Sequence, residues 1–171
     1  HMIIIILRMA ELEALIMVVE TKWFGTIDIS EDKIITFDMG IMGFEDYKKF
    51  TIIYDSERDN GREVVWLQSV DDKNFALPVM NPDIVYKGYD PVVEDELLAS
   101  IGDDILNAPL MVFVTLTVGQ DIKKMTCNLK APIIINADTR KGCQLIADNE
   151  EYPVKYPIYD IISAASKKGG E

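Results

Sequence analysis

The feature that most constrains how this 171-residue chain can fold is a succession of short runs of β-branched and aromatic residues, separated by Gly, Asn, Asp or Pro. Runs of this composition are typical of β-strands, and the residues between them are typical of turns. The clearest runs are 27–29, 34–37, 50–54, 64–68, 75–80, 110–118, 131–136 and 143–147. Because no long helical segments alternate with these runs, neighbouring strands are expected to pair antiparallel. The sequence therefore predicts a mostly β fold, as a small antiparallel barrel or a sandwich.

One short internal helix and one C-terminal helix are predicted beside the strands. Three consecutive acids at 94–96 would occupy the first turn of the internal helix, where the helix dipole favours negative charge, and Gly102 would end it. Near the C-terminus, apolar residues recur at helical spacing and form a stripe. They are Ile158, Ile161, Ile162 and Ala165. This stripe would pack either against the barrel itself or on a partner protein.

The chain is expected to divide into a leader at 1–17, a barrel domain at 18–159 and a helical tail at 160–171. His1 and Met2 resemble a cloning remnant. Within the leader, several apolar residues share one helical face. They are Met9, Leu12, Leu15 and Ile16. Residues 3–16 would either cover an edge of the core or another subunit, or result from a start codon placed too early.

The charge of the chain indicates the kind of partner that it can bind. Seventeen Lys and Arg residues stand against 29 Asp and Glu residues, which gives a formal net charge of −12. A surface of this sign repels phosphate groups, so direct binding to nucleic acid or to an anionic membrane is not expected. The same surface attracts a basic protein and speeds its encounter.

The cellular compartment is indicated by the apolar N-terminal run and by the cysteines. The run at 3–7 is too short to span a bilayer, and Arg8 and Glu11 follow it. Cys127 and Cys143 have no CxxC spacing and are expected to be reduced thiols in the core, with a disulfide between neighbouring strands as the alternative. These patterns favour a cytoplasmic protein.

The residues that most enzymes need are missing from the sequence. The single histidine is His1, so a histidine base, a nucleophile–histidine pair and a histidine metal site are not expected. The glycines at 40–43 lack the spacing of a phosphate-binding loop. Acid pairs at 71–72 and 103–104 more naturally mark turns, although a carboxylate hydrolase remains one alternative. We therefore expect no catalysis, no cofactor and no metal.

Several blocks of sequence are specific when they are taken together. FDMGIMGFE at 37–45 is a strand that enters a bend, where the glycines would allow a positive φ or a close approach of the backbone. The other blocks are WLQSVDD at 66–72, MTCNLKAPIIIN at 125–136, a TRKG turn at 139–142, and YPV and YP at 152–154 and 156–157. In this order and spacing, from about 18 to 157, the blocks resemble the FliW family of flagellar assembly factors.

The resemblance to this family implies a small antiparallel β-barrel, a cytoplasmic location and no catalysis. It also implies two protein partners, flagellin and the RNA-binding translational regulator CsrA. Flagellin in the cytoplasm would occupy the protein, and flagellin export would free it to bind CsrA, which would then release flagellin mRNA for translation. An acidic protein beside the basic RNA-binding surface would repel the phosphate backbone. The chain departs from the family pattern at Asp38 and Met42, where prolines are usual, and at Cys127, where alanine is usual.

Eight residues at loop ends, expected to be exposed, are the candidates for partner binding. They are Phe44, Glu45, Asp71, Asp72, Asn128, Lys130, Tyr156 and Ile158. Some have a plainer structural explanation: the aromatic rings can pack on the barrel, the acid pair can form a turn, and Asn128 can cap a bend of the backbone. The main alternative function is that of a small-ligand-binding β-barrel.

Overall fold

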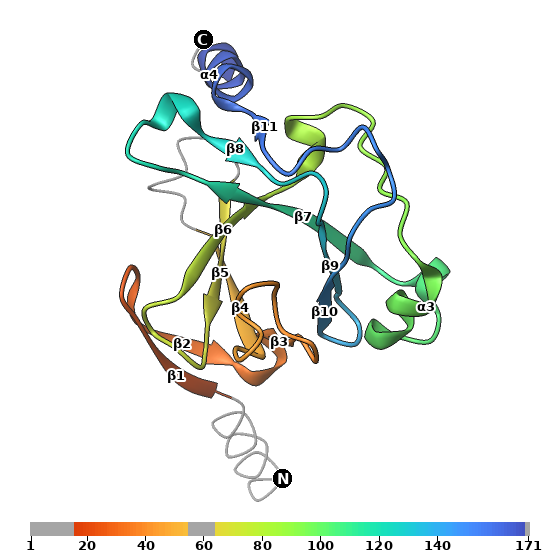
Figure 1. The fold of residues 1–171 in the computed structure, drawn as a ribbon. Coiled ribbons are helices and arrows are strands. Elements are labelled where there is room, and N and C mark those ends of the chain that lie inside the picture. Colours follow the sequence, from red (N-terminus) through yellow and green to blue (C-terminus); the bar gives the residue numbers. More distant parts are fainter. Residues whose placement is uncertain (1–15, 55–63, 170–171) are drawn as a thin grey trace, which may run out of the picture.

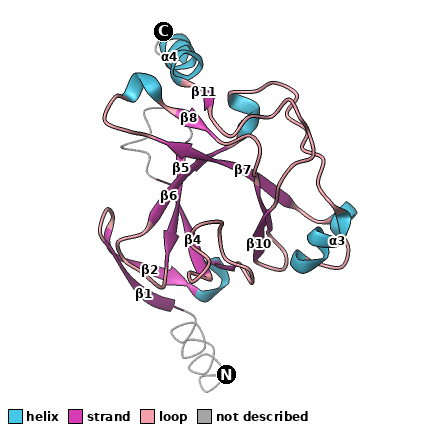
Figure 2. Cartoon of the chain, viewed as in Figure 1, coloured by secondary structure: helices cyan, strands magenta, loops and turns pink. Residues whose placement is uncertain are grey.

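The computed structural model describes residues 16–54 and 64–169 and shows a closed β-barrel with short helices at its periphery (Figures 1 and 2). The first two strands, β1 (Ile16–Thr21) and β2 (Gly25–Ser30), form a hairpin of their own. The main sheet contains β3 (Ile34–Thr36), β4 (Lys49–Tyr54), β5 (Val64–Ser69), β6 (Ala76–Met80), β7 (Leu110–Thr117), β8 (Thr126–Cys127), β9 (Ile133–Asn136), β10 (Lys141–Gln144) and β11 (Tyr156–Pro157). The barrel and not the sandwich is therefore the correct form of the predicted β fold.

Seven strands close the barrel in the order β7-β6-β5-β4-β3-β10-β9, because β9 also pairs with β7. The pairings are antiparallel, as predicted, except at the contact between β3 and β10. That parallel contact consists of one residue pair, Thr36 opposite Lys141. Gly142, beside it, lies against Phe37, and a Cβ on this glycine would stand 2.5 Å from the ring. The close approach of β10 to Phe37, where β3 and β10 meet, therefore requires a glycine at position 142.

The barrel is filled by side chains that alternate along its strands, as expected for strands with one buried face. Phe50 of β4, Leu67 of β5 and Val79 of β6 are fully buried in the same cluster. The Phe37 and Phe50 rings meet edge to face, with their centroids 5.3 Å apart. These side chains form the packed core of the barrel at this level.

The C-terminal helix α4 (Tyr159–Gly169) packs on the barrel wall near β8 and β11, at the top of Figure 1. Ile158, just before the helix, and Ile162 within it are buried with Leu116, Leu129 and Tyr152. Of the two alternatives for the apolar stripe, packing against the barrel is therefore correct for these two side chains. The side chain of Ala165 lies outside the described set.

The predicted internal helix is also confirmed. It begins as α3 (Asp95–Leu98) and continues as the 3₁₀ turn η3 (Ala99–Ile101), in which Ile101 is fully buried. The remaining short 3₁₀ turns are η1 (Glu31–Lys33), η2 (Pro82–Ile84), η4 (Ile105–Asn107) and η5 (Ile122–Lys124). Within residues 16–54 and 64–169, none of the helices has the length and apolar content needed to cross a bilayer.

The N-terminal prediction can be compared with the structure only in part. Strand β1 begins at Ile16, so the ordered β pattern starts one residue before the predicted end of the leader. Ile16, the last residue of the predicted helical face, lies in this strand and not in a helix, because it pairs with Ser30 of β2. The other three residues of that face, Met9, Leu12 and Leu15, lie outside the described residues. The hairpin is attached to the barrel through Phe24, whose ring meets that of Trp66 at 5.8 Å, and through a hydrogen bond from Lys22 N to Lys73 O.

Candidate functional site

The eight predicted partner-binding residues fall into two groups at different places on the barrel. Phe44 and Glu45 in the bend lie near Asp71 and Asp72 in the β5–β6 turn, because Tyr47 and Phe75 contact residues of both segments. The second group lies at β8 and β11 and consists of Asn128, Lys130, Tyr156 and Ile158. These two strands pair with each other, and Tyr156 stands opposite Cys127. In Figure 1 these two strands lie at the top and β3 and β4 lie toward the bottom. The candidates therefore do not form one continuous site.

The bend at 37–45 has the backbone that its glycines predicted. Gly40 and Gly43 have φ values of +68° and +87°. A Cβ on Gly40 would stand 2.6 Å from both the Cα and the carbonyl oxygen of Glu45, whereas a Cβ on Gly43 would meet nothing within 4 Å. Both predicted properties, a positive φ and a close backbone approach, are confirmed at Gly40. The bend is tight because the chain returns directly over this residue.

Three apolar side chains are exposed along this bend. Met39 is 80% exposed, Met42 is 44% exposed and Phe44 is 43% exposed. The Phe44 ring packs on Phe75 with a centroid distance of 4.3 Å, which holds it on the surface in one place. Glu45 accepts a hydrogen bond from Gly43 N at 3.0 Å, and this bond lowers the pKa of its carboxyl group. The bend therefore presents a small, ordered apolar strip to solvent.

The acid pair of the β5–β6 turn is used mainly within the fold. One carboxylate oxygen of Asp71 accepts hydrogen bonds from Lys48 N at 3.0 Å and Lys49 N at 3.2 Å. Asp72 accepts one from the Tyr47 hydroxyl at 2.6 Å, and this bond lowers the pKa of Asp72 while it raises the pKa of Tyr47. These carboxylates connect the turn to residues 47–49, which follow the bend, so this end of the barrel is held by side-chain hydrogen bonds.

Asn128 and Lys130 also have internal hydrogen-bond partners. The Asn128 side-chain oxygen accepts hydrogen bonds from Lys130 N at 3.0 Å and Ala131 N at 3.1 Å, which is the capping arrangement considered from the sequence. The Lys130 ammonium donates to Asn149 O at 2.8 Å. Both residues hold the entry to β9 in place.

The last two candidates lie in the packed region below α4. Tyr156 is half-buried, and its ring meets that of Tyr86 at 5.5 Å. Ile158 has no exposed surface. The expectation that Ile158 is an exposed residue is therefore wrong. Its backbone N continues the pairing of β11 by donating to Met125 O, and its side chain lies in the core with Leu129 and Tyr152.

An acidic surface that was not among the candidates lies around α3. No Lys or Arg stands between Lys87 and Lys123, and this stretch contains an excess of exposed acids. Around α3 they are Asp90, Glu94, Asp95, Glu96, Asp103 and Asp104, whereas Asp121 lies apart from them at the N-cap of η5. The sequence alone could have predicted this surface, because residues 88–122 contain no Lys or Arg.

The segment around α3 continues into the acids at 148–151. Asp148 N donates to Val92 O and Val92 N donates to the Asn149 side chain, each at 2.7 Å, so the two stretches lie side by side. Exposed apolar side chains stand among the acids: Val92 is 55%, Leu97 is 47% and Leu106 is 98% exposed. We refer to residues 90–106 with 148–151 as the acidic face.

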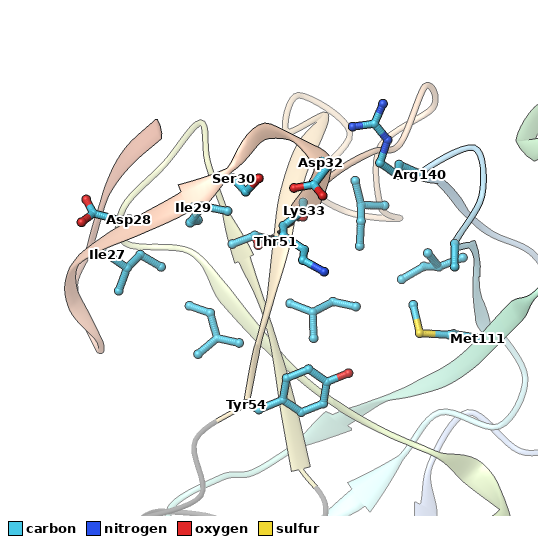
Figure 3. Close-up of a pocket in the computed structure, with 15 residues that line it drawn as sticks. Ile27, Asp28, Ile29, Ser30, Asp32, Lys33, Thr51, Tyr54, Met111 and Arg140 are labelled. Carbon is cyan, nitrogen blue, oxygen red and sulfur yellow. Dashed lines mark hydrogen bonds between the residues drawn. The ribbon is translucent and has the colours of Figure 1, made fainter. Parts of the chain in front are cut away.

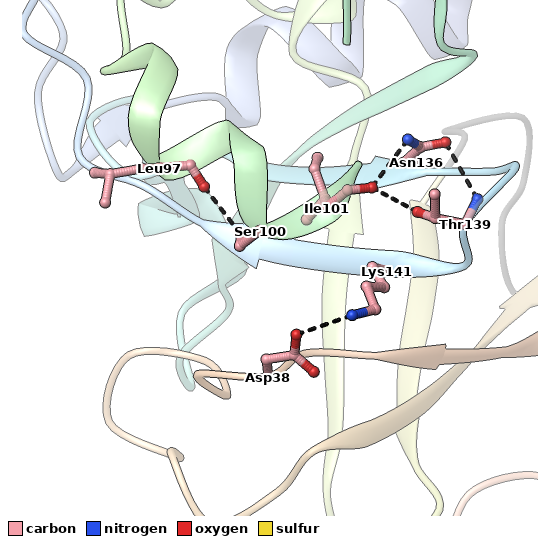
Figure 4. A network of polar contacts seen from close by, with 7 residues as sticks. All are labelled: Asp38, Leu97, Ser100, Ile101, Asn136, Thr139 and Lys141. Carbon is pink, nitrogen blue, oxygen red and sulfur yellow. Dashed lines mark hydrogen bonds and ion pairs between the residues drawn. The ribbon is translucent and has the colours of Figure 1, made fainter. Parts of the chain in front are cut away.

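The acidic face is attached to the barrel by a buried polar contact at its centre (Figure 4). Ile101 O accepts hydrogen bonds from the Asn136 side chain at 3.0 Å and from the Thr139 hydroxyl at 2.6 Å. Asn136, at the end of β9, is only 3% exposed. The helix is thus fixed to the β9–β10 turn, while Glu94, Asp95 and Glu96 are exposed.

The two cysteine thiols and the acidic side chains are groups of the described residues that can bind a metal ion. Cys127 and Cys143 are free and buried, as expected, and burial raises the pKa of their thiols to about 12 and about 11. Both thiols are therefore protonated and unreactive at neutral pH. No cluster of three or more His, Cys, Asp or Glu side chains suited to a metal ion occurs in the described part of the chain.

Comparison with known proteins gives one consistent family. A family model described as "FliW protein" matches residues 18–158. The flagellar assembly factor FliW of Lachnospira eligens is 61% identical over 146 residues, covering 85% of this chain and 97% of the relative. That of Lachnoclostridium phytofermentans is 51% identical over 152 residues, covering 89% of this chain and 97% of the relative.

The fold agrees with the sequence comparison. A crystal structure of the flagellar assembly factor FliW superimposes with a TM-score of 0.74 and 29% sequence identity, and it covers 83% of this chain and 96% of the other. The family match extends over the barrel, the bend and the acidic face alike. This chain belongs to the FliW family of flagellar assembly factors.

Proposed function

We propose that this flagellar assembly factor works in the cytoplasm as a non-catalytic binding protein for two partners, flagellin and the RNA-binding regulator CsrA. When flagellin leaves the cell, the freed protein binds CsrA and displaces flagellin mRNA from it, so that translation resumes. Family membership supports the flagellar role, and the acidic face is the observation that supports the choice of a basic partner.

The acidic face has the properties that a basic RNA-binding protein would recognise. It combines exposed carboxylates with exposed apolar side chains, of which Leu106 is the most prominent. Apolar contacts supply affinity at an interface, while charge supplies orientation and association rate. Its attachment through Ile101 means that the face exists before a partner arrives, so little ordering is required on binding.

The proposed antagonism is electrostatic. A protein of net charge −12 that is bound beside an RNA site lowers the local affinity for phosphates without covering the site. The repulsion acts over roughly one Debye length, about 8 Å at physiological ionic strength, and it weakens as salt is added. The mechanism is therefore noncompetitive and salt-dependent.

The bend is the proposed contact for flagellin. Its exposed strip of Met39, Met42 and Phe44 is apolar, whereas the acidic face carries many exposed carboxylates. Among the eight candidates, Phe44 and Glu45 are the two that keep this role most directly, because both are exposed. Asp71, Asp72, Asn128, Lys130 and Tyr156 would act by holding the neighbouring backbone.

The proposal is tested by calorimetric titration of the purified protein with its cognate CsrA and flagellin. The triple variant Glu94→Lys, Asp95→Lys, Glu96→Lys should lose CsrA binding by about 100-fold while it retains flagellin binding. A matched control, Glu20→Lys, Asp46→Lys, Asp83→Lys, changes the net charge equally but spreads the change over other exposed positions. Equal losses for both triples would show that overall charge matters and the acidic face does not. If the unaltered protein binds neither partner, the proposed function is wrong.

A second measurement tests the mechanism. A CsrA–RNA complex is titrated with this protein at increasing salt concentration, and RNA release is followed by fluorescence anisotropy. Release should weaken as salt rises, at protein concentrations that keep CsrA saturated with this protein. Release that does not change with salt, or that is abolished by excess RNA, would contradict the noncompetitive electrostatic mechanism.

A further inference from the structure

A groove of about 630 Å³ opens beside the barrel between the hairpin strand β2 and the second half of β4 (Figure 3). Residues 27–30 of β2 line one side and residues 51–54 of β4 line the other. Met111 of β7 and Arg140 of the β9–β10 turn close its far side. The groove is therefore assembled from segments far apart in the sequence.

Both strands that line this groove leave an edge unpaired within the described residues. Strand β4 pairs with β3 only up to Thr51, opposite Ile34, although it continues to Tyr54. Strand β2 pairs only with β1. A free edge carries backbone N–H and C=O groups that can pair with an added strand.

The floor of the groove is aliphatic. Ile27 and Ile52 are half-buried, and they stand beside the buried Ile29, Ile35 and Ile135. Half-buried aliphatic side chains next to a free strand edge offer the alternating side-chain pockets that an extended peptide requires.

One end of the groove is basic, which is unusual for this acidic protein. Lys33 and Arg140 line the groove, and Arg140 also lines a neighbouring depression together with Lys49 and Lys141. Among the described residues, the Arg140 guanidinium donates a hydrogen bond to Glu31 O at 3.4 Å, which involves one of the five N–H groups that a guanidinium carries. Of the carboxylates that line the groove, Asp28 lies on β2, whereas Asp32 lies in η1 beside Lys33, at the same end as Arg140 (Figure 3). The two cations outnumber this one acid, so this end of the groove favours a carboxylate on the ligand.

We propose that this groove is a docking site for an extended protein segment that carries aliphatic side chains and a carboxylate. The segment adds to the free edge of β4, places alternate side chains on the aliphatic floor, and pairs its carboxylate with Arg140 and Lys33. Its charge preference is opposite to that of the acidic face, so the molecule has two docking surfaces that select partners of opposite sign.

The test uses a phage-displayed library of random dodecapeptides selected on the full chain. Enriched peptides should share aliphatic residues at alternate positions and at least one Asp or Glu. A synthetic peptide of the enriched sequence is then measured by fluorescence anisotropy against the unaltered protein and its variants. Arg140→Glu and Ile27→Asp should each weaken binding about tenfold or more.

Two matched variants serve as controls. Lys123→Glu makes the same charge change at an exposed position, and Val154→Asp makes a similar change at a residue that is 58% exposed, both outside the groove. They should change peptide affinity by less than about twofold. Urea unfolding of all four variants shows which of them remain folded, and if Ile27→Asp is unfolded, Arg140→Glu decides the matter.

A separate readout follows amide hydrogen exchange at residues 52–54, which should slow when the peptide is added. No enrichment, enrichment of basic peptides, or equal binding to Arg140→Glu would each overturn the proposal. Peptides that bind without slowing exchange on β4 would rule out strand addition. Because the probe is a synthetic peptide, none of these outcomes depends on flagellin or CsrA, and the proposed function stands or falls separately.

Discussion

The bend end of the barrel and the acidic face both carry exposed acids, but they use them differently. At the bend end, the carboxylates of Glu45, Asp71 and Asp72 accept hydrogen bonds from Gly43, from two backbone N–H groups and from Tyr47. On the acidic face, the side chains of Glu94 and Asp95 make no hydrogen bond or ion pair with the described part of the chain.

This difference separates acids that stabilise the fold from acids that are free to meet a partner. A carboxylate whose oxygens already accept several hydrogen bonds is restrained, and altering it disturbs the structure first. A carboxylate without internal partners can be altered at little cost to stability, so its removal reports on binding alone. Mutational data from the two regions must consequently be interpreted differently.

The largest effect is expected at Gly40. Gly40→Ala should lower the free energy of unfolding by about 3 kcal/mol, because the new Cβ meets the Glu45 backbone at 2.6 Å and the residue has a positive φ. Gly43→Ala has the same kind of φ but open space around the Cβ, and it should cost only about 1 kcal/mol. Urea unfolding measures both changes. Equal losses for the two variants would show that the close approach at Gly40 contributes nothing.

A smaller effect is expected at Asp71. Asp71→Ala removes the acceptor of two backbone hydrogen bonds and should cost about 1 kcal/mol of unfolding free energy. Asp103→Ala, on the acidic face, is the control and should change stability by less than about 0.5 kcal/mol. Thermal or urea unfolding provides the measurement. If both variants are equally stable, the distinction between the two regions fails.

The pH dependence of stability should depend on the Tyr47–Asp72 hydrogen bond. The Tyr47 hydroxyl lowers the pKa of Asp72 in the folded state below its ordinary value of 3.8. The unfolded chain therefore takes up this proton first as the pH falls, and the bond's contribution is complete above pH 3.8 and is lost below it. Tyr47→Phe should give a shallower loss of stability on acidification, measured by urea unfolding from about pH 5 to about pH 3. An unchanged slope would contradict this assignment.

The smallest effect on stability is expected for neutral substitutions on the acidic face. Glu94→Gln with Glu96→Gln should change the free energy of unfolding by less than about 0.5 kcal/mol, since neither side chain has a hydrogen-bond or ion-pair partner among residues 16–54 and 64–169. Circular dichroism during thermal unfolding checks this. A clear loss of stability would place these acids among the structural ones and remove the contrast between the regions.

The parts of the fold that follow from local pattern could be predicted from the sequence. Strands such as β4, β5 and β7 are long enough to show β-branched composition, and the bend at 37–45 was marked by its glycines. Strands β8 and β11 consist of two residues each, which is too short to show any period. They exist because they pair with each other and because β8 also pairs with β7, which is a tertiary effect.

The candidate site was harder to predict, because exposure depends on neighbours that the local sequence does not reveal. Ile158 resembles a surface residue by its position after two prolines, yet it is in the core because α4 folds back over the barrel. The groove between β2 and β4 could not be foreseen, since Met111 and Arg140 reach it only once the barrel has closed. The acidic face, in contrast, was readable as a long interval without Lys or Arg.

The single parallel contact between β3 and β10 has a consequence for how the molecule is made. At this contact, Thr36 N donates to Arg140 O at 2.9 Å. The Lys141 ammonium forms an ion pair with the Asp38 carboxylate at 3.2 Å, and these two residues are 103 positions apart in the sequence. During synthesis β3 to β6 emerge well before β10, so the β3 edge lacks its β10 neighbour until then. The barrel cannot close until β10 has left the exit tunnel, so closure waits for synthesis of the last quarter of the chain.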